Sequence, residues 1–177
     1  MFQRAIVGQP APEFEMEAVF EEDFSEVKSA TYRGKYLVLL FYSRDFTPLC
    51  SSELTAFSAR AAEFEAADCR VVGVSTDSKY THLAFVSTPS EDGGVGELRI
   101  PLLADHNHAT ARAFEVFNAT GHAERATFII DPKGILRFSC VHDPRVGRSV
   151  AETLRIVRAL QHVDANNTAA GPEWTEG

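Results

Sequence analysis

Residues 36–53, YLVLLFYSRDFTPLCSSE, join a continuous apolar run to the start of a helix. Residues 36–42 are apolar or aromatic along their whole length, which is typical of a strand buried on both faces of a sheet. Thr47 is of a type favoured just before a helix, and Pro48 suits the first helical position. The stretch therefore predicts a buried strand, a short loop, and a helix that carries Cys50 in its first turn.

Downstream of this stretch, helical and strand patterns continue to alternate. Leu54, Phe57, Ala61 and Phe64 recur at spacings of three and four residues, which predicts one amphipathic helix. Residues 70–75, RVVGVS, then predict another buried strand.

The second half of the chain predicts a helix, a hairpin and a final helix. Residues 109–117 look helical, and the turn signal DPKG at 131–134 joins strands expected over 128–130 and 135–141. The sequence SVAE at 149–152 is a capping box that opens a last helix. The apolar stripe of that helix comprises Val150, Leu154, Val157 and Leu160.

The order of elements predicts a single α/β domain with a mixed central sheet flanked by helices. We place this domain at residues 1–163. Residues 164–177 are polar and small, and we expect them to form a mobile tail anchored by Trp174.

Charge and cysteine content narrow the functional classes. The formal net charge is −8, which argues against a surface for nucleic acid or anionic membranes, because such surfaces need clustered basic residues. No apolar run approaches the roughly 18 residues of a membrane span, and the N-terminus lacks the pattern of a signal peptide. The three cysteines are too few and too dispersed for a disulfide framework, so we expect a cytoplasmic protein.

Cys50 is the candidate for chemistry. The free N–H groups and the positive dipole end of a helix N-terminus stabilise an anion, so the pKa of this thiol should fall below its usual value of about 8.5. Ser51 and Ser52 follow it, so no CxxC motif is present, and a dithiol reductase of the thioredoxin type is excluded. A small buried side chain without chemistry is the alternative that the residues alone leave open.

We expect no metal and no cofactor. His106, His108, Cys140 and His142 are of metal-ligand type but have no recognised spacing, and loop histidines explain them better.

The sequence around Cys50 resembles the active-site segment of the peroxiredoxins, specifically the typical two-cysteine (alkyl hydroperoxide reductase) branch, whose pattern is YPxDFTxxCPTE. Similarity to the family extends over nearly the whole chain, in order. The matching segments are VGQPAP at 7–12, VSTDS at 74–78, THLA at 81–84, TP at 88–89 with GGVG at 93–96, IPLLAD at 100–105, FIIDPKG at 128–134 and VGRSV at 146–150.

This resemblance implies a thioredoxin-like fold and a thiol-dependent peroxidase that reduces hydrogen peroxide and organic hydroperoxides. Cys50 stands at the place of the peroxidatic cysteine, which becomes a sulfenic acid. Thr47 stands where a threonine binds the peroxide oxygens. Arg125 matches the arginine that lowers the thiol pKa and polarises the O–O bond, and Glu53 and Arg148 match a pair that orients this arginine.

The chain departs from the family pattern at two places. Ser43 replaces a proline that packs over the site, and Ser51-Ser52 replaces Pro-Thr. The family's resolving cysteine lies a few residues before a C-terminal tryptophan, where this chain has Ala170 closest to the expected position. The resemblance therefore implies that an external thiol reductant, thioredoxin-like or other, resolves the sulfenic acid. Cys69 and Cys140 are better interpreted as core residues.

The resemblance also implies homodimers joined edge to edge near Phe138, gathered into a decamer around the Phe46 loop. Because the resolving thiol is missing, a non-catalytic oligomeric chaperone, or holdase, that keeps this fold is the alternative function.

Overall fold

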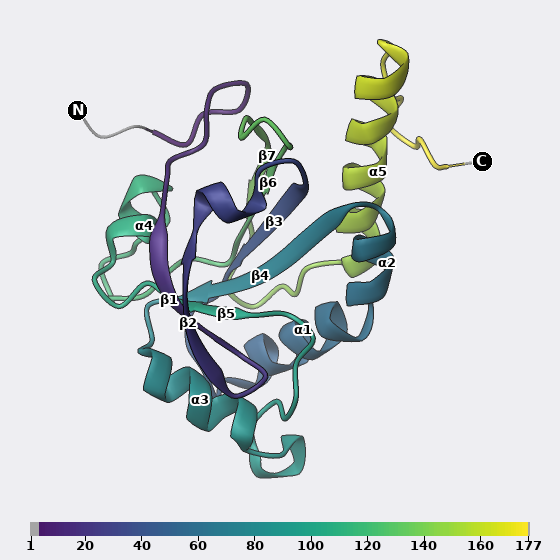
Figure 1. Ribbon diagram of the computed structural model, residues 1–177. Helices are drawn as coiled ribbons and strands as arrows, with labels where there is room; N and C mark the ends of the chain where they lie inside the picture. Colours follow the sequence, from purple (N-terminus) through teal and green to yellow (C-terminus); the bar gives the residue numbers. More distant parts are fainter. Residues whose placement is uncertain (1–3, 177) are drawn as a thin grey trace.

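The computed structural model describes residues 4–176 and shows a seven-stranded mixed sheet with helices on both faces (Figure 1). In chain order the elements are β1 (Glu15–Phe20), β2 (Asp23–Lys28), the 3-10 helix η1 (Ser29–Tyr32), β3 (Tyr36–Phe41), α1 (Pro48–Ala59), α2 (Ala61–Ala66), β4 (Cys69–Ser75), α3 (Lys79–Ser87), the 3-10 helix η2 (Ser90–Asp92), β5 (Leu102–Ala104), α4 (Ala109–Ala113), β6 (Ala126–Ile130), β7 (Leu136–Val141) and α5 (Val150–Asn166).

The sheet has the strand order β2-β1-β5-β4-β3-β6-β7. Strands β3, β4 and β5 are parallel, as expected where helices connect them, whereas β1, β2, β6 and β7 join through antiparallel pairs. The predicted α/β class with a mixed central sheet is confirmed, and the architecture is thioredoxin-like. The active-site stretch thus begins at an inner strand of the sheet.

Two hydrophobic cores lie on opposite faces of this sheet. Along β3, Val38 and Leu40 point into the first core, whereas Leu37 and Leu39 point into the second. Helices α1, α2 and α5 cover the first core, and α4 and the N-terminal segment contribute to the second (Figure 1). All six residues of β3 are buried, as its uninterrupted apolar sequence predicts.

The single amphipathic helix expected after Cys50 is two helices. Helix α1 ends at Ala59 and α2 begins at Ala61, because the chain tightens at Arg60, whose N–H bonds the Phe57 carbonyl at 3.2 Å. The predicted apolar stripe is nevertheless buried across the break.

The helix expected over residues 109–117 is shorter. Helix α4 ends at Ala113, and Glu115 adopts a left-handed conformation with φ 58°. Phe117 then pairs with Ala123 in an isolated antiparallel bridge, so the chain is already extended where the apolar pattern suggested helix.

A bulge interrupts the alternation of side chains along β7. Ile129 pairs with Phe138 but Ile130 pairs with Leu136, so Arg137 is an extra residue in this strand. Leu136 therefore packs in the second core while Phe138 packs against the first, although period-two alternation puts them on one face. Cys140 is half-buried and lines a cavity of about 90 Å³ together with Phe138.

The last helix continues to Asn166, so the expected domain border after residue 163 falls inside α5. Asp164 explains the extension, because its carboxylate accepts a hydrogen bond from the Tyr36 hydroxyl. It also accepts two from the Arg137 guanidinium, at 2.9 and 3.0 Å. Beyond the helix the chain runs back beside α5 (Figure 1), and the Trp174 ring lies 5.0 Å from that of His162. Within residues 4–176, no helix is long and apolar enough to span a membrane.

Candidate active site

Cys50 is the third residue of α1 and is 1% exposed. Thr47 is the N-cap residue, as predicted, and Pro48 occupies the first turn. The Thr47 hydroxyl donates to the Arg44 carbonyl at 2.8 Å and makes no capping bond with the helix. The N–H groups of the first turn have no partner inside a helix, so their partial positive charge lies beside the sulfur.

Arg125 connects the thiol to a buried ion cluster. Its Nη2 lies 3.6 Å from the Cys50 Sγ, and its Nη1 donates to the carboxylate of Glu53, one helical turn beyond the cysteine. The Pro144 carbonyl accepts from Nε and Nη2 at 3.3 and 3.1 Å. The guanidinium is therefore held from two sides with one edge directed at the sulfur.

Arg148 completes the cluster and ties it to the sheet. Its backbone N–H and Nε donate to Glu53 Oε1 at 2.7 and 3.0 Å, and Nη2 donates to Oε2 at 2.9 Å. Its Nη1 donates to the carbonyls of Phe41 and Ala126 at 2.9 and 2.8 Å. These carbonyls end β3 and begin β6, so the cluster is fixed to the paired strands beneath it.

The charges of this cluster do not balance when the thiol is neutral. Glu53, Arg125 and Arg148 are 5%, 4% and 8% exposed, so one carboxylate faces two guanidinium groups away from water. Buried charge is stabilised by a partner of opposite sign. A Cys50 thiolate supplies the missing negative charge.

The pKa of Cys50 is accordingly below its ordinary value. Burial raises it, but the polar groups of Ser43, Thr47 and the Arg44 backbone near the sulfur, together with the charge of Arg125, lower it further than burial raises it. Cys69 shows the opposite case, because burial raises the pKa of its thiol to about 12. The cysteine in the first turn of α1 is thus the more acidic of the two.

A second buried network positions the loop over residues 43–47. The Tyr42 hydroxyl donates to Asp45 Oδ1 at 2.7 Å, and His82 Nδ1 lies 2.7 Å from Asp45 Oδ2. The Asp45 N–H donates to Asp77 at 2.9 Å. Sequence reasoning missed this role for Asp45 and His82, and the only signal was that both lie in segments that match the family.

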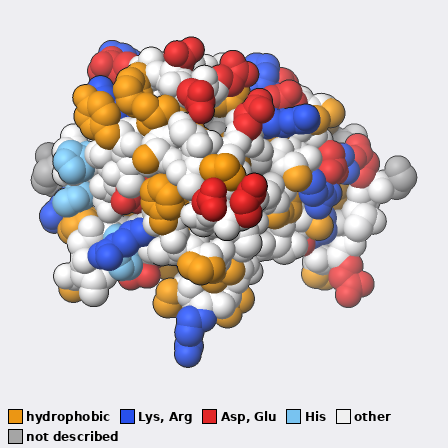
Figure 2. Space-filling model, turned by 90° about the horizontal axis from the view of Figure 1, so that it is seen from below, with side chains coloured by type: hydrophobic (Ala, Val, Ile, Leu, Met, Phe, Trp, Pro, Cys, Tyr) orange, Lys and Arg blue, Asp and Glu red, His pale blue; other side chains and the backbone are white. Residues whose placement is uncertain are grey.

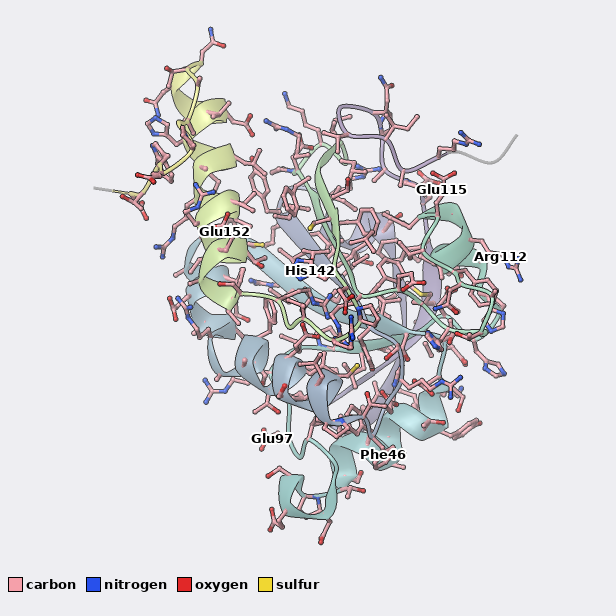
Figure 3. All side chains as sticks on the ribbon, turned by 180° about the vertical axis from the view of Figure 1, so that it is seen from behind. Phe46, Glu97, Arg112, Glu115, His142 and Glu152 are labelled. Carbon is pink, nitrogen blue, oxygen red and sulfur yellow. The ribbon has the colours of Figure 1, made fainter. Side chains whose placement is uncertain are left out.

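Phe46 lies at the tip of this loop with φ 59°, a left-handed conformation that is uncommon for an aromatic residue. Its ring packs 5.0 Å from that of Phe85 on α3 yet stays 44% exposed. Figure 3 shows it beside α3. The loop therefore presents an apolar side chain to the outside while its backbone is anchored inside.

The residues predicted from the resemblance meet in space. Cys50, Glu53, Arg125 and Arg148 form one contiguous buried group, and Thr47 precedes Cys50 at the helix N-cap. Among residues 4–176, no three His, Cys, Asp or Glu side chains are grouped so that they could hold a metal ion.

Comparison with known proteins gives one consistent result. The model of the AhpC/TSA family matches residues 7–139. Bovine peroxiredoxin-2 is 49% identical over 175 residues, covering 98% of this chain and 88% of the relative. The crystal structure of reduced 2-Cys peroxiredoxin from Plasmodium vivax superposes with a TM-score of 0.94 at 38% identity, covering 97% of this chain and 90% of that one.

A further structure, Plasmodium yoelii Prx1a modified at its N-terminus, is described as an artifactual octamer. It has a TM-score of 0.87 at 35% identity and covers 97% of this chain and 100% of that one. The family match spans most of the sequence, and the similarity extends to the whole fold. The chain therefore belongs to the AhpC/TSA family and is a peroxiredoxin, a thiol-dependent peroxidase.

Proposed function

We propose that Cys50 is the peroxidatic cysteine, which reduces hydrogen peroxide and organic hydroperoxides. The observation that carries this assignment is the 3.6 Å contact between its sulfur and Arg125 Nη2, within a buried cluster that has one positive charge in excess. The thiolate attacks one peroxide oxygen, the O–O bond breaks, and the second oxygen leaves with the bonding electrons and takes up a proton. Cys50 becomes a sulfenic acid, and water or an alcohol is released.

Arg125 and Thr47 act on the peroxide in this scheme. The guanidinium stays charged and its N–H groups beside the sulfur stabilise negative charge as it develops on the leaving oxygen. The Thr47 hydroxyl, already near the thiol, can exchange its bond to the Arg44 carbonyl for one to a peroxide oxygen. Glu53 and Arg148 are positioning residues, because their contacts hold Arg125 against the sulfur.

An external thiol completes the cycle. The sequence has alanine at position 170, and the remaining cysteines are Cys69, which is fully buried, and Cys140, which is half-buried on β7. One external thiol condenses with the sulfenic acid and releases water. A second then reduces the mixed disulfide, which restores Cys50.

The assembly we propose is a homodimer, with five dimers forming a decamer. Strand β7 ends the sheet, so its outer backbone groups can pair with those of a second copy near Phe138. The exposed Phe46 ring provides an apolar contact for the ring of dimers. Hydrophobic side chains also lie exposed on the face seen in Figure 2. We also propose the cytoplasm as the location. The proposed mobile tail begins after α5 ends at Asn166, rather than at the border expected after residue 163.

The test of the catalytic assignment is peroxide consumption driven by a small dithiol. Cys50→Ser should abolish it, whereas Cys69→Ser and Cys140→Ser should retain it. Activity that survives in Cys50→Ser and disappears in either other variant would show that the nucleophile is misassigned.

A further inference from the structure

Ser43 stands where the family pattern has a proline, and its side chain contacts Cys50. It follows Tyr42, just beyond the end of β3, and its hydroxyl oxygen lies 3.4 Å from the Cys50 sulfur. No other hydrogen bond of this hydroxyl is found among residues 4–176. Among these residues, the reactive sulfur is thus the one hydrogen-bond partner found for it.

The loop holds this contact in place. Tyr42 is anchored through its bond to Asp45, and Asp45 is bound in turn by His82 and Asp77. The residues on both sides of Ser43 are therefore anchored, which keeps its side chain beside the sulfur. Such a hydroxyl can donate to a thiolate without displacing any other bond.

The family proline at this position cannot make this contact, because a proline ring carries no hydrogen-bond donor. In this chain the buried sulfur has Arg125 Nη2 at 3.6 Å and the Ser43 hydroxyl at 3.4 Å. A buried anion is stabilised by each donor directed at it, and a hydrogen bond to a charged group is stronger than one between neutral groups.

Given the proposed role of Cys50, we infer that Ser43 is a catalytic residue whose hydroxyl donates a hydrogen bond to the Cys50 thiolate. The consequence has two opposing parts. The bond increases the fraction of thiolate at pH values below the thiol pKa, and it makes each thiolate less nucleophilic. Removing the hydroxyl should therefore lower the reaction rate at low pH and raise it at high pH, rather than lower it at every pH.

The experiment compares Ser43→Ala with the wild type in two assays across pH. The first measures the alkylation rate of Cys50, and the second measures the rate constant with hydrogen peroxide. Ser43→Ala should raise the pKa of Cys50 and lower the thiolate fraction about tenfold at pH values below it, as expected for a lost bond to a charged group. Each remaining thiolate should react about threefold faster.

The two effects give crossing profiles. The peroxide rate constant of Ser43→Ala should be about threefold lower than that of the wild type at low pH and up to about threefold higher at high pH. Loss of structure would lower it at every pH. Ser43→Thr keeps a hydroxyl and should follow the wild type, and Ser43→Pro, which restores the family residue, should follow Ser43→Ala.

Ser51→Ala is the matched control. Ser51 adjoins Cys50 in sequence, but its buried hydroxyl has no hydrogen-bond partner among residues 4–176, so its loss should leave the Cys50 pKa unchanged. Mapping the alkylated residue by mass spectrometry separates the two possible failures. Label on Cys69 or Cys140 would overturn the proposed function. Label on Cys50 with the same pKa in wild type, Ser43→Ala and Ser43→Pro would overturn the role of Ser43 alone.

Discussion

Replacing Glu53 by glutamine should lower the stability of the protein while Cys50 stays reactive, so it tests the two roles of the ion cluster separately. Glutamine has nearly the same volume and can still accept a hydrogen bond, but it carries no charge. The variant therefore leaves Arg125 and Arg148, which are 4% and 8% exposed, without their shared carboxylate. We expect a large loss of stability together with a Cys50 that remains reactive.

The magnitude follows from burial. Removing one partner of a buried ion pair costs about 3–5 kcal/mol, and the hydrogen bonds that glutamine retains favour the lower end. If the free energy of unfolding falls by about 2 kcal/mol per molar urea, a loss of about 3 kcal/mol lowers the unfolding midpoint by about 1.5 M. Glu152→Gln is the matched control, because its pair with Arg155 is on the surface and should contribute less than about 1 kcal/mol.

The pH dependence adds a second signature. Burial raises the pKa of Glu53, but hydrogen bonds and charge from Arg148, and the charge of Arg125, lower it further, so the net shift is downward. A lowered folded-state pKa stabilises the protein above the ordinary carboxyl pKa, and this contribution disappears as the pH falls through the lowered value. The stability difference between wild type and Glu53→Gln should therefore shrink in acid.

The assay is urea unfolding at one fixed protein concentration, since association also affects stability, combined with alkylation of Cys50 against pH. The uncompensated guanidinium groups should keep the Cys50 pKa low or lower it further. Equal midpoint shifts in Glu53→Gln and Glu152→Gln would refute the reasoning about buried charge. A raised Cys50 pKa in Glu53→Gln would refute the charge count.

Three further outcomes are expected. Sedimentation should show dimers or larger assemblies that involve the β7 edge near Phe138, and monomer alone at micromolar concentration would contradict this. Excess peroxide without added thiol should give monomer-mass chains with oxidised Cys50, because position 170 offers no thiol. A disulfide from Cys50 to either other cysteine as the main product would instead show an internal resolving step. Asp164→Asn should weaken the ion pair with Arg137 and lower the free energy of unfolding by about 1 kcal/mol or less. It should also speed hydrogen exchange at the end of α5, and unchanged exchange there would show that this ion pair does not hold the helix end.

The sequence predicted those elements whose formation depends on neighbouring residues. The apolar run of β3, the turn at residues 131–134 and the serine cap of α5 were all predicted, and the Ser149 hydroxyl accepts from the Glu152 N–H at 3.1 Å. The hairpin of β1 and β2 gave no such signal. Its turn uses Glu21 and Glu22 at φ 51° and 63°, where glycine or asparagine would have indicated a turn, and β2 is almost wholly exposed.

The candidate site depended on both levels. Sequence by itself placed Cys50 in the first turn of a helix, because residue types at helix starts reflect local hydrogen bonding and dipole effects. Arg125 and Arg148 had no distinguishing local pattern, and only the family resemblance selected them. They reach Glu53 across 72 and 95 residues of chain because β6 pairs with β3.

Tertiary structure alone decided what surrounds the sulfur. The Ser43 contact and the excess positive charge of the buried cluster arise from the way the strands pair and from exclusion of water. Residue type and spacing encode which segment becomes a strand or a helix, since those preferences act over a few residues. The distance between side chains far apart in sequence, and the burial that strengthens their charges, exist only once the sheet has formed.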